Sequence, residues 1–376
     1  MLRRLQLRFA IYFCGAMLYI GLCGVASAQS CGASGLHDLT GEHASTGDHV
    51  PLVDHHTHVL TPRSAHWIEV QGKSALKPRG IEDLLTAMHD DGVERAAVLS
   101  VAYWFGHTTE KTQRNYDDVK TENDNIGRLV ANYPKQLVAF FGINPLAPTA
   151  LQEIRRNIDS GRFVGIKLHL ANADVDLRNP SQIKQLASVF ALANKLHVPI
   201  VVHMRTRRKD YGYVDSANFI KGVLSKAPDI TVQIAHLAGW GGYDSNTDGA
   251  LRAFVDNKEK IRTKLYFDIA AIVSDENTES SDRKATLRWP DTHYKEVLAG
   301  RLREIGLQRV VFGTDWPLVA PAKYWHEFSE QIPLEPCELA IIRANRTPWL
   351  TDTPKDALVY SRLMHHGGRP LTSSFP

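Results

Sequence analysis

Cysteine is scarce in this chain of 376 residues, which contains four. Cys14 and Cys23 fall in an apolar N-terminal segment, Cys31 lies in a polar, glycine-rich arm, and Cys337 follows much later. Two cysteines beyond the first segment are too few to staple a body of this size, and neither has the sequence context of a nucleophile. We therefore expect a core held together by packing, and cysteine catalysis is disfavoured.

Net charge is also small, at +3, with 44 Lys and Arg against 41 Asp and Glu. Arg3, Arg4 and Arg8 account for this excess because residues 1–28 contain no acid, so the remainder of the chain is neutral. A neutral body gives no electrostatic reason to expect nucleic acid or an anionic membrane as a partner. A small molecule is the expected partner.

The long apolar run is confined to the N-terminus. Residues 1–8 are basic, an apolar run follows, and Ala26-Ser27-Ala28 has the A-x-A pattern of a cleavage site. This combination predicts a secretory signal peptide over residues 1–28 and export to the periplasm or the medium. An uncleaved membrane anchor is one alternative. A lipoprotein anchored at Cys31 is another, and the polar Gln29 speaks against it.

Beyond this segment, the chain alternates between two kinds of pattern. Residues 29–49 predict a flexible leader, because they are rich in Gly, Ser, Thr and His without periodicity, and residues 361–376 a C-terminal tail. Between 50 and 360, short apolar runs alternate with amphipathic stretches such as Ile81–Asp91 and Ile183–Leu196. The strand candidates are Val50–Val53, Arg95–Val101, Leu137–Ile143, Val164–Leu168, Pro199–Val202, Thr231–Ala235, Leu265–Ile269 and Arg309–Phe312.

The alternation predicts the class of fold. Hydrophobic residues make up 43% of the chain, enough for a large core, and continuous apolar strands indicate a parallel sheet covered by helices. Eight strand–helix units predict an α/β fold, a single-domain (β/α)8 TIM barrel over residues 50–360. A doubly wound open sheet is the alternative, but no glycine-rich phosphate fingerprint follows the first strand. The active site of a barrel lies at the carboxyl ends of its strands.

Metal-ligating residue types gather at these strand ends. The first strand runs into Asp54-His55-His56-Thr57-His58, and His56 and His58 point the same way because side chains alternate along a strand. Later strands end at His203, His236 and Asp315. Neutral imidazole with one carboxylate suits Zn²⁺ and related metals. We expect His55 to pack outside the site, and eight other histidines to have no part in it: His37, His43, His49, His66, His89, His107, His365 and His366.

The motifs VDHHTH, FVGIKLHL, VPIVVHM, IAHLAGWGG, YFDIAA and VVFGTDWP resemble the amidohydrolase superfamily, in its amidohydrolase-related branch. That branch contains decarboxylases, such as aminocarboxymuconate semialdehyde decarboxylase, beside true hydrolases. The resemblance runs from about Val50 to about Leu350 and includes Asn123, Asn144-Pro145 and the segment IIRANRTPWL. The motifs are specific to the superfamily and much less specific for the reaction.

The one-metal form of this family implies a set of roles. His56, His58, His203 and Asp315 would hold one divalent ion, with a water completing the shell. The ion would lower the pKa of that water. Asp315 would accept its proton, and His236 would polarise the substrate carbonyl or protonate the leaving group. Zn²⁺ is the first expectation for the metal, with Mn²⁺ or Fe²⁺ as alternatives.

A two-metal form would place a second ion on His203 and His236 and bridge the pair through a carboxylated Lys167. Alternatively, Lys167 stays an ammonium paired to Asp315 or to the substrate. One ion is favoured because this branch mostly resembles one-metal sites. His169 shares the face of Lys167, so a role beside the metal or against the substrate is open.

The remaining candidates surround the metal. Asp54 and Asp268 stand at strand ends and could orient the histidine rings, or else cap the following turns. Tyr103 and Trp104 offer stacking area after the second strand, which hints at a flat substrate, and Trp240 could add to it. Arg205, with Arg207 and Arg208, could grip a carboxylate or simply lie in a solvated loop.

These residues favour metal-dependent hydrolysis of a small amide, lactone or ester-like bond. The alternative is non-oxidative decarboxylation of a small carboxylic acid on the same metal, with an aromatic acid as one option. A barrel that binds a ligand without catalysis is a third class, which the intact ligand set disfavours. A homodimer is a further expectation, because barrels of this family often pair.

Overall fold

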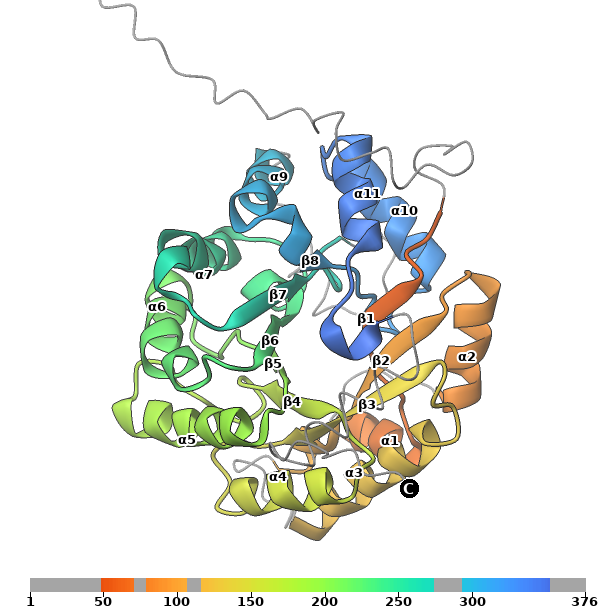
Figure 1. The fold of residues 1–376 in the computed structure, drawn as a ribbon, viewed down its shortest axis with the longest axis vertical. Coiled ribbons are helices and arrows are strands. Elements are labelled where there is room, and N and C mark those ends of the chain that lie inside the picture. Colours follow the sequence, from red (N-terminus) through yellow and green to blue (C-terminus); the bar gives the residue numbers. More distant parts are fainter. Residues whose placement is uncertain (1–48, 71–78, 107–115, 274–292, 352–376) are drawn as a thin grey trace, which may run out of the picture. The chain divides into compact units, whose positions relative to one another are not determined.

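Eight parallel strands form one sheet in the order of the sequence, which confirms the predicted barrel (Figure 1). The structure is a computed structural model and describes residues 49–70, 79–106, 116–273 and 293–351. The strands are β1 (Val53–Thr57), β2 (Arg95–Leu99), β3 (Leu137–Ile143), β4 (Gly165–His169), β5 (Ile200–His203), β6 (Thr231–Ile234), β7 (Lys264–Asp268) and β8 (Val310–Val311).

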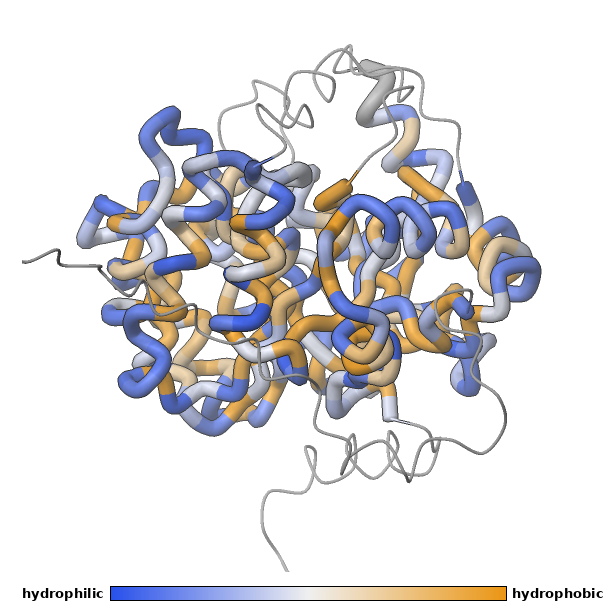
Figure 2. Tube along the Cα trace, turned by 90° about the horizontal axis from the view of Figure 1, so that it is seen from above, coloured by the Kyte–Doolittle hydropathy of each residue, from blue (hydrophilic) through white to orange (hydrophobic). Residues whose placement is uncertain are grey.

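Helices surround the strands, as Figure 1 shows. They are α1 (Pro62–Val70), α2 (Ile81–Asp90), α3 (Tyr116–Val130), α4 (Ala150–Asp159), α5 (Pro180–Leu196), α6 (Tyr213–Gly222), α7 (Ser245–Asp256), α9 (His293–Ile305), α10 (Pro321–Gln331) and α11 (Pro336–Ala344). Apolar segments run through the interior in Figure 2, and polar segments lie mostly toward the outside. Three short 3₁₀ turns also matter for the site and the core: η1 (Ala102–Trp104), η3 (Ala235–Ala238) and η6 (Pro348–Leu350).

The barrel closes where β1 meets the segment that follows β8. The His55 amide donates to the Phe312 carbonyl at 3.0 Å, and the Asp315 amide donates to the His56 carbonyl at 2.8 Å. The His58 amide donates to the Trp316 carbonyl at 2.7 Å. These bonds bring the two ends of the sheet together, so the ends of β1 and β8 carry their side chains to one mouth.

The predicted position of the first strand is wrong. The strand is not Val50–Val53 but Val53–Thr57, so it includes most of the histidine motif. All five residues of β1 are buried although most are polar. Thr57 Oγ1, for example, donates to the Ala97 carbonyl at 2.9 Å, because a buried polar group must find a partner. Hydropathy therefore misses a strand whose polar groups are satisfied inside the fold.

The floor of the barrel is filled by apolar side chains from several strands. Phe140 of β3 packs edge-to-face against Trp349 of η6, with ring centroids 5.3 Å apart. Gly165 of β4 allows this packing, because a Cβ there would lie 2.2 Å from the Phe140 ring. The interior at this end of the barrel is thus a packed core and not a pore.

Several predictions lie outside the described residues. They are the signal peptide over 1–28, most of the leader over 29–49, Cys31, the C-terminal tail over 361–376, and the histidines His37, His43, His107, His365 and His366. His49, His66 and His89 are described, and all three are exposed. Among the helices that the structure describes, none combines the length and apolarity needed to cross a membrane.

Candidate metal centre and substrate pocket

His56 and His58 present the same ring atom to the mouth of the barrel. The Nδ1 atom of His56 lies 3.0 Å from Asp268 Oδ2, and the Nδ1 atom of His58 lies 2.6 Å from the Leu99 carbonyl oxygen. An acceptor at Nδ1 favours the tautomer that carries its proton there. The Nε2 atoms are therefore left as lone-pair donors, and they lie 3.3 Å from each other.

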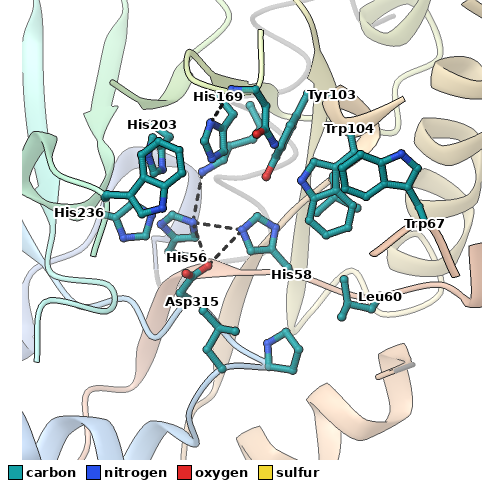
Figure 3. A pocket seen from close by; sticks show the side chains of 16 residues that line it. His56, His58, Leu60, Trp67, Tyr103, Trp104, His169, His203, His236 and Asp315 are labelled. Carbon is teal, nitrogen blue, oxygen red and sulfur yellow. Dashed lines mark hydrogen bonds and ion pairs between the residues drawn. The ribbon is translucent and has the colours of Figure 1, made fainter. Parts of the chain in front are cut away.

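Asp315 completes this group from the segment after β8 (Figure 3). Its Oδ1 atom lies 3.3 Å from His58 Nε2 and 3.6 Å from His56 Nε2. Its backbone has φ of 61°, a left-handed conformation that costs a non-glycine residue about 1–3 kcal/mol and is concentrated at functional sites. Asp54 helps to hold this segment, because Thr314 Oγ1 donates to its carboxylate at 2.7 Å.

The chemistry of these three side chains fits a divalent metal. Their ligand atoms lie within 4.8 Å of one another, and three electron-rich atoms repel each other unless a cation lies between them. Burial lowers the pKa of His56 to about 3, with the charge of Lys167 adding to the effect. Burial alone would raise the pKa of Asp315, but His58 and His56 hold it well below its usual range. His56 and Asp315 are thus in the protonation states that a metal requires.

His203, the fourth predicted ligand, lines the same pocket but does not join this close group. Its ring stacks on His169 with centroids 3.8 Å apart and an angle of 11°. Its Nε2 atom is buried and has no hydrogen-bond partner among the described residues. Such an atom is costly to leave unpaired, so it needs a ligand from outside the chain. The structure brings three of the four predicted ligands together, and the fourth lines the same pocket.

His236 lies beside the group, in the turn η3. Its Nδ1 atom lies 2.7 Å from the Ala270 carbonyl oxygen, and its ring is centred 4.7 Å from that of His56. The residue has a left-handed backbone with φ of 52°, and its amide donates to Asp268 Oδ1 at 2.9 Å. His236 therefore also presents Nε2 to the pocket, from the side opposite the Trp67 and Trp104 rings (Figure 3).

The two predicted orienting carboxylates differ in what they touch. Asp268 accepts hydrogen bonds from His56, from two backbone amides and from Gln233 Nε2, the last at 2.6 Å. Burial opposes its ionisation, but His56 and His236 hold the pKa of Asp268 well below its usual range. The carboxylate has no free lone pair for a metal, so it orients His56. Asp54 bonds to the backbone of His56 and to Thr314, and it has no hydrogen bond to an imidazole within the part of the chain that the structure describes.

Lys167 is buried and lines the pocket. Its Nζ atom lies 3.2 Å from His56 Nε2, the atom that faces His58 and Asp315 (Figure 3). Burial lowers the pKa of Lys167 to about 8, although Asp268 and Asp315 oppose the shift. The amine therefore stands beside the candidate metal position, and its carboxylation stays a prediction.

Aromatic rings form one wall of a cavity of about 260 Å³ above these groups. The cavity is lined by four residues that the sequence suggested for substrate contact, Tyr103, Trp104, His169 and Trp240. Trp67 of α1 also lines it, and its ring stacks on Trp104 with centroids 5.1 Å apart at 11°. Sequence reasoning missed Trp67 because α1 was not recognised. An aromatic residue in the connection after the first strand was the available signal.

The expected carboxylate clamp is not found at Arg205. The Nη1 atom of Arg205 contacts both carboxylate oxygens of Asp244, at 3.0 and 2.9 Å, and the side chain does not line the cavity. Arg207 pairs with Asp174 at 3.0 Å, and Arg208 pairs with Asp210. Arg205 and Arg207 each meet an acid supplied by a neighbouring loop, a pairing that the sequence spacing does not reveal, whereas Asp210 belongs to the same loop as Arg208. His55 is buried as expected, with Nδ1 2.9 Å from the Phe312 carbonyl oxygen.

The sequence matches a known family over this same region. The family model described as Amidohydrolase (Amidohydro_2) matches residues 53–344, so the chain belongs to this family of metal-dependent enzymes. Comparison with the curated proteins finds no match.

Solved structures with the same fold include both lyases and other family members. One is 5-carboxyvanillate decarboxylase from Sphingomonas paucimobilis, with a TM-score of 0.56 and 13% identity over 83% of this chain and 99% of that one. A zinc-bound amidohydrolase from Burkholderia multivorans has a TM-score of 0.54 and 15% identity over 78% and 96%. A 2,6-dihydroxybenzoate decarboxylase has a TM-score of 0.52 and 14% identity over 84% and 100%. At these identities the likeness concerns the fold.

Proposed function

We propose that this protein is a metal-dependent hydrolase acting on a small amide, lactone or ester-like substrate. The observation that supports this is the convergence of His56 Nε2, His58 Nε2 and Asp315 Oδ1 within 3.3–3.6 Å of one another. The Nδ1 atoms of the two histidines are already engaged, and His203, whose Nε2 atom has no hydrogen-bond partner among the described residues, lines the same pocket. A divalent ion bound there would supply a Lewis acid and a water of lowered pKa.

The protein's own groups would handle the protons. The Asp315 carboxylate is ionised and is one of the three candidate metal ligands, so it would accept a proton from the attacking water. His236 stands on the other side of the pocket, where it polarises the substrate carbonyl or protonates the leaving group. Asp268 keeps the His56 ring oriented throughout, through its bond to Nδ1.

The cavity supports a small, flat substrate. Its volume of about 260 Å³ is just below the roughly 300–1,000 Å³ of pockets for drug-sized ligands. Trp67 and Trp104 stack on each other and give an apolar face on which a ring or planar group can rest. Trp240, with 39% of its surface exposed, also lines the cavity.

Non-oxidative decarboxylation is the second candidate. The aromatic wall suits an aromatic acid, and two of the proteins with the same fold are named as decarboxylases of such acids. In this reaction the metal would orient the substrate carboxylate, and one of the pocket residues would protonate the ring carbon as CO₂ leaves.

Purified protein should be assayed for bound metal and then tested on two panels with Zn²⁺ or Mn²⁺ added. One panel holds small aryl esters, lactones and amides, and the other holds hydroxylated aromatic carboxylic acids. Acid release from the first panel, lost in His56→Ala and Asp315→Asn, is the expected result. CO₂ release from the second panel alone would favour the lyase. Absence of both, with no metal retained, would contradict the enzyme proposal.

Export and partners belong to the same proposal. We infer that residues 1–28 are removed and that the mature enzyme acts in the periplasm or the medium, because the N-terminal sequence has a basic start, an apolar run and an A-x-A site. N-terminal sequencing of the exported protein should then begin at Gln29. A small molecule is the proposed partner. A homodimer is expected from gel filtration with light scattering.

A further inference from the structure

The turn that carries His236 has an unfavourable backbone. His236, Leu237 and Ala238 have φ of 52°, 51° and 68°, three successive left-handed residues, none of them glycine. L-residues visit this region singly, because the Cβ atom crowds the following carbonyl. One internal bond, from the Gly239 amide to the His236 carbonyl at 2.7 Å, is a small compensation. Contacts from outside the turn must therefore hold it in place.

Tyr211 supplies one such contact from the connection between β5 and α6. Its hydroxyl donates to the Ala238 carbonyl at 2.8 Å, and both residues are buried. This carbonyl belongs to the last left-handed residue of the turn. The bond therefore ties the His236 turn to the connection that follows the neighbouring strand.

Arg205 supports the same turn indirectly, through its contact with the Tyr211 ring. Its guanidinium carbon lies 5.7 Å from the centre of the Tyr211 ring, and its Nη1 atom contacts Asp244 and Thr247 Oγ1, the latter at 3.1 Å. Asp244 caps α7 by accepting the Thr247 amide at 2.7 Å. Thr247 also packs closely against Gly239, because a Cβ added at Gly239 would lie 2.8 Å from the Thr247 side chain. Arg205 thus connects Tyr211, which bonds to the turn, with Asp244 and Thr247 at the start of α7.

We propose that Tyr211 and Arg205 are positioning residues that fix His236 in its reactive orientation. The inference rests on the proposed function, in which His236 acts on the substrate. It assigns to Arg205 a role different from the expected grip on a carboxylate. Neither residue lines the cavity, so both act through the turn and not by touching the substrate.

The test compares Tyr211→Phe with Tyr243→Phe. Tyr243 is an equally buried tyrosine nearby, and its hydroxyl bonds to Asp248 of α7 at 2.7 Å rather than to the turn. Hydrogen exchange measured by mass spectrometry should become faster in the peptide spanning 236–239 in Tyr211→Phe only. With the substrate identified by the two panels, Tyr211→Phe should lower kcat about ten- to hundred-fold, with KM nearly unchanged. Tyr243→Phe should keep both.

A double-mutant cycle separates positioning from general damage. In a His236→Gln background, Tyr211→Phe should cost less than about two-fold, because there is no longer a reactive ring to misplace. An equal loss in both backgrounds, or unchanged exchange in the turn, would overturn the proposal. If the wild type turns over neither panel, the proposed function fails, while the exchange comparison still decides whether Tyr211 holds the turn.

Discussion

Asp268 determines which nitrogen of His56 is offered to a metal. Its Oδ2 atom lies 3.0 Å from His56 Nδ1, and the carboxylate is ionised because donors surround it. Replacement by asparagine keeps the shape but weakens this bond. Loss of such an orienting partner typically costs ten- to hundred-fold in metal affinity.

We therefore expect Asp268→Asn to bind Zn²⁺ about ten- to hundred-fold more weakly than the wild type in competition with a chromophoric chelator. Glu122→Gln is the matched control, because Glu122 is an equally buried carboxyl that does not line the pocket. Equal affinities in the wild type and Asp268→Asn would show that Asp268 does not act on the metal site.

The raised pKa of Glu122 leads us to predict that the free energy of unfolding depends on pH. Burial raises its pKa to about 7 from a usual value of 4.5, against the hydrogen bond from Thr61. The folded state therefore binds more protons than the unfolded state between these two values, so this residue lowers stability as pH rises through that window. The full effect is about 3 kcal/mol.

Urea unfolding at pH 5 and pH 8 should show this contribution. Relative to the wild type, Glu122→Gln should gain up to about 3 kcal/mol between the two pH values, because glutamine cannot ionise. Glu94→Gln, at an exposed position, should follow the wild type. A Glu122→Gln protein with the wild-type pH slope would contradict the assignment.

At the residue scale, strand-end position was a good guide and loop chemistry was not. His56, His58 and Asp315 converge because parallel strands end at one mouth, a property of the topology alone. Arg205 follows β5 just as closely, yet it turns to Asp244 from another loop. Nothing in its local sequence marks that pairing, because it depends on where the β6–α7 connection runs.

At the scale of elements, we predict that adding one methyl group at Gly165 of β4 strongly lowers the stability of the protein. A Cβ there would lie 2.2 Å from the Phe140 ring and 2.8 Å from the Pro199 carbonyl oxygen. Neither neighbour can retreat inside a packed sheet. Gly165→Ala should therefore destabilise the protein by about 3 kcal/mol or prevent folding.

Gly300→Ala is the matched change in a helix. Gly300 lies inside α9, and an added Cβ would meet nothing within 4 Å. This variant should gain about 0.5–1 kcal/mol, because alanine loses less backbone entropy on folding. Thermal unfolding of both variants checks the pair, and a Gly165→Ala protein as stable as the wild type would refute the packing argument.

Elements with a strong apolar signal were predicted well from the sequence. Leu137–Ile143 was predicted with the bounds of β3, because seven consecutive apolar residues are buried on both faces. β1 was displaced toward its apolar start, since Asp54 and the histidines read as polar although they are buried. Hydropathy detects burial by apolar contact and misses burial by hydrogen bonding.

At the scale of the whole molecule, the metal proposal predicts a change in thermal stability. A ligand that binds only the folded state at about 100 times its dissociation constant adds about 2.7 kcal/mol, a rise in Tm of about 4 °C for a protein of this size. Added Zn²⁺ should raise Tm by this amount, and a chelator should reverse it. The double variant His56→Ala/His58→Ala should not respond, while His89→Ala, at an exposed position in α2, should respond as the wild type does. A response that survives in the double variant would place the ion elsewhere, because His56 and His58 supply two of the three converging ligand atoms.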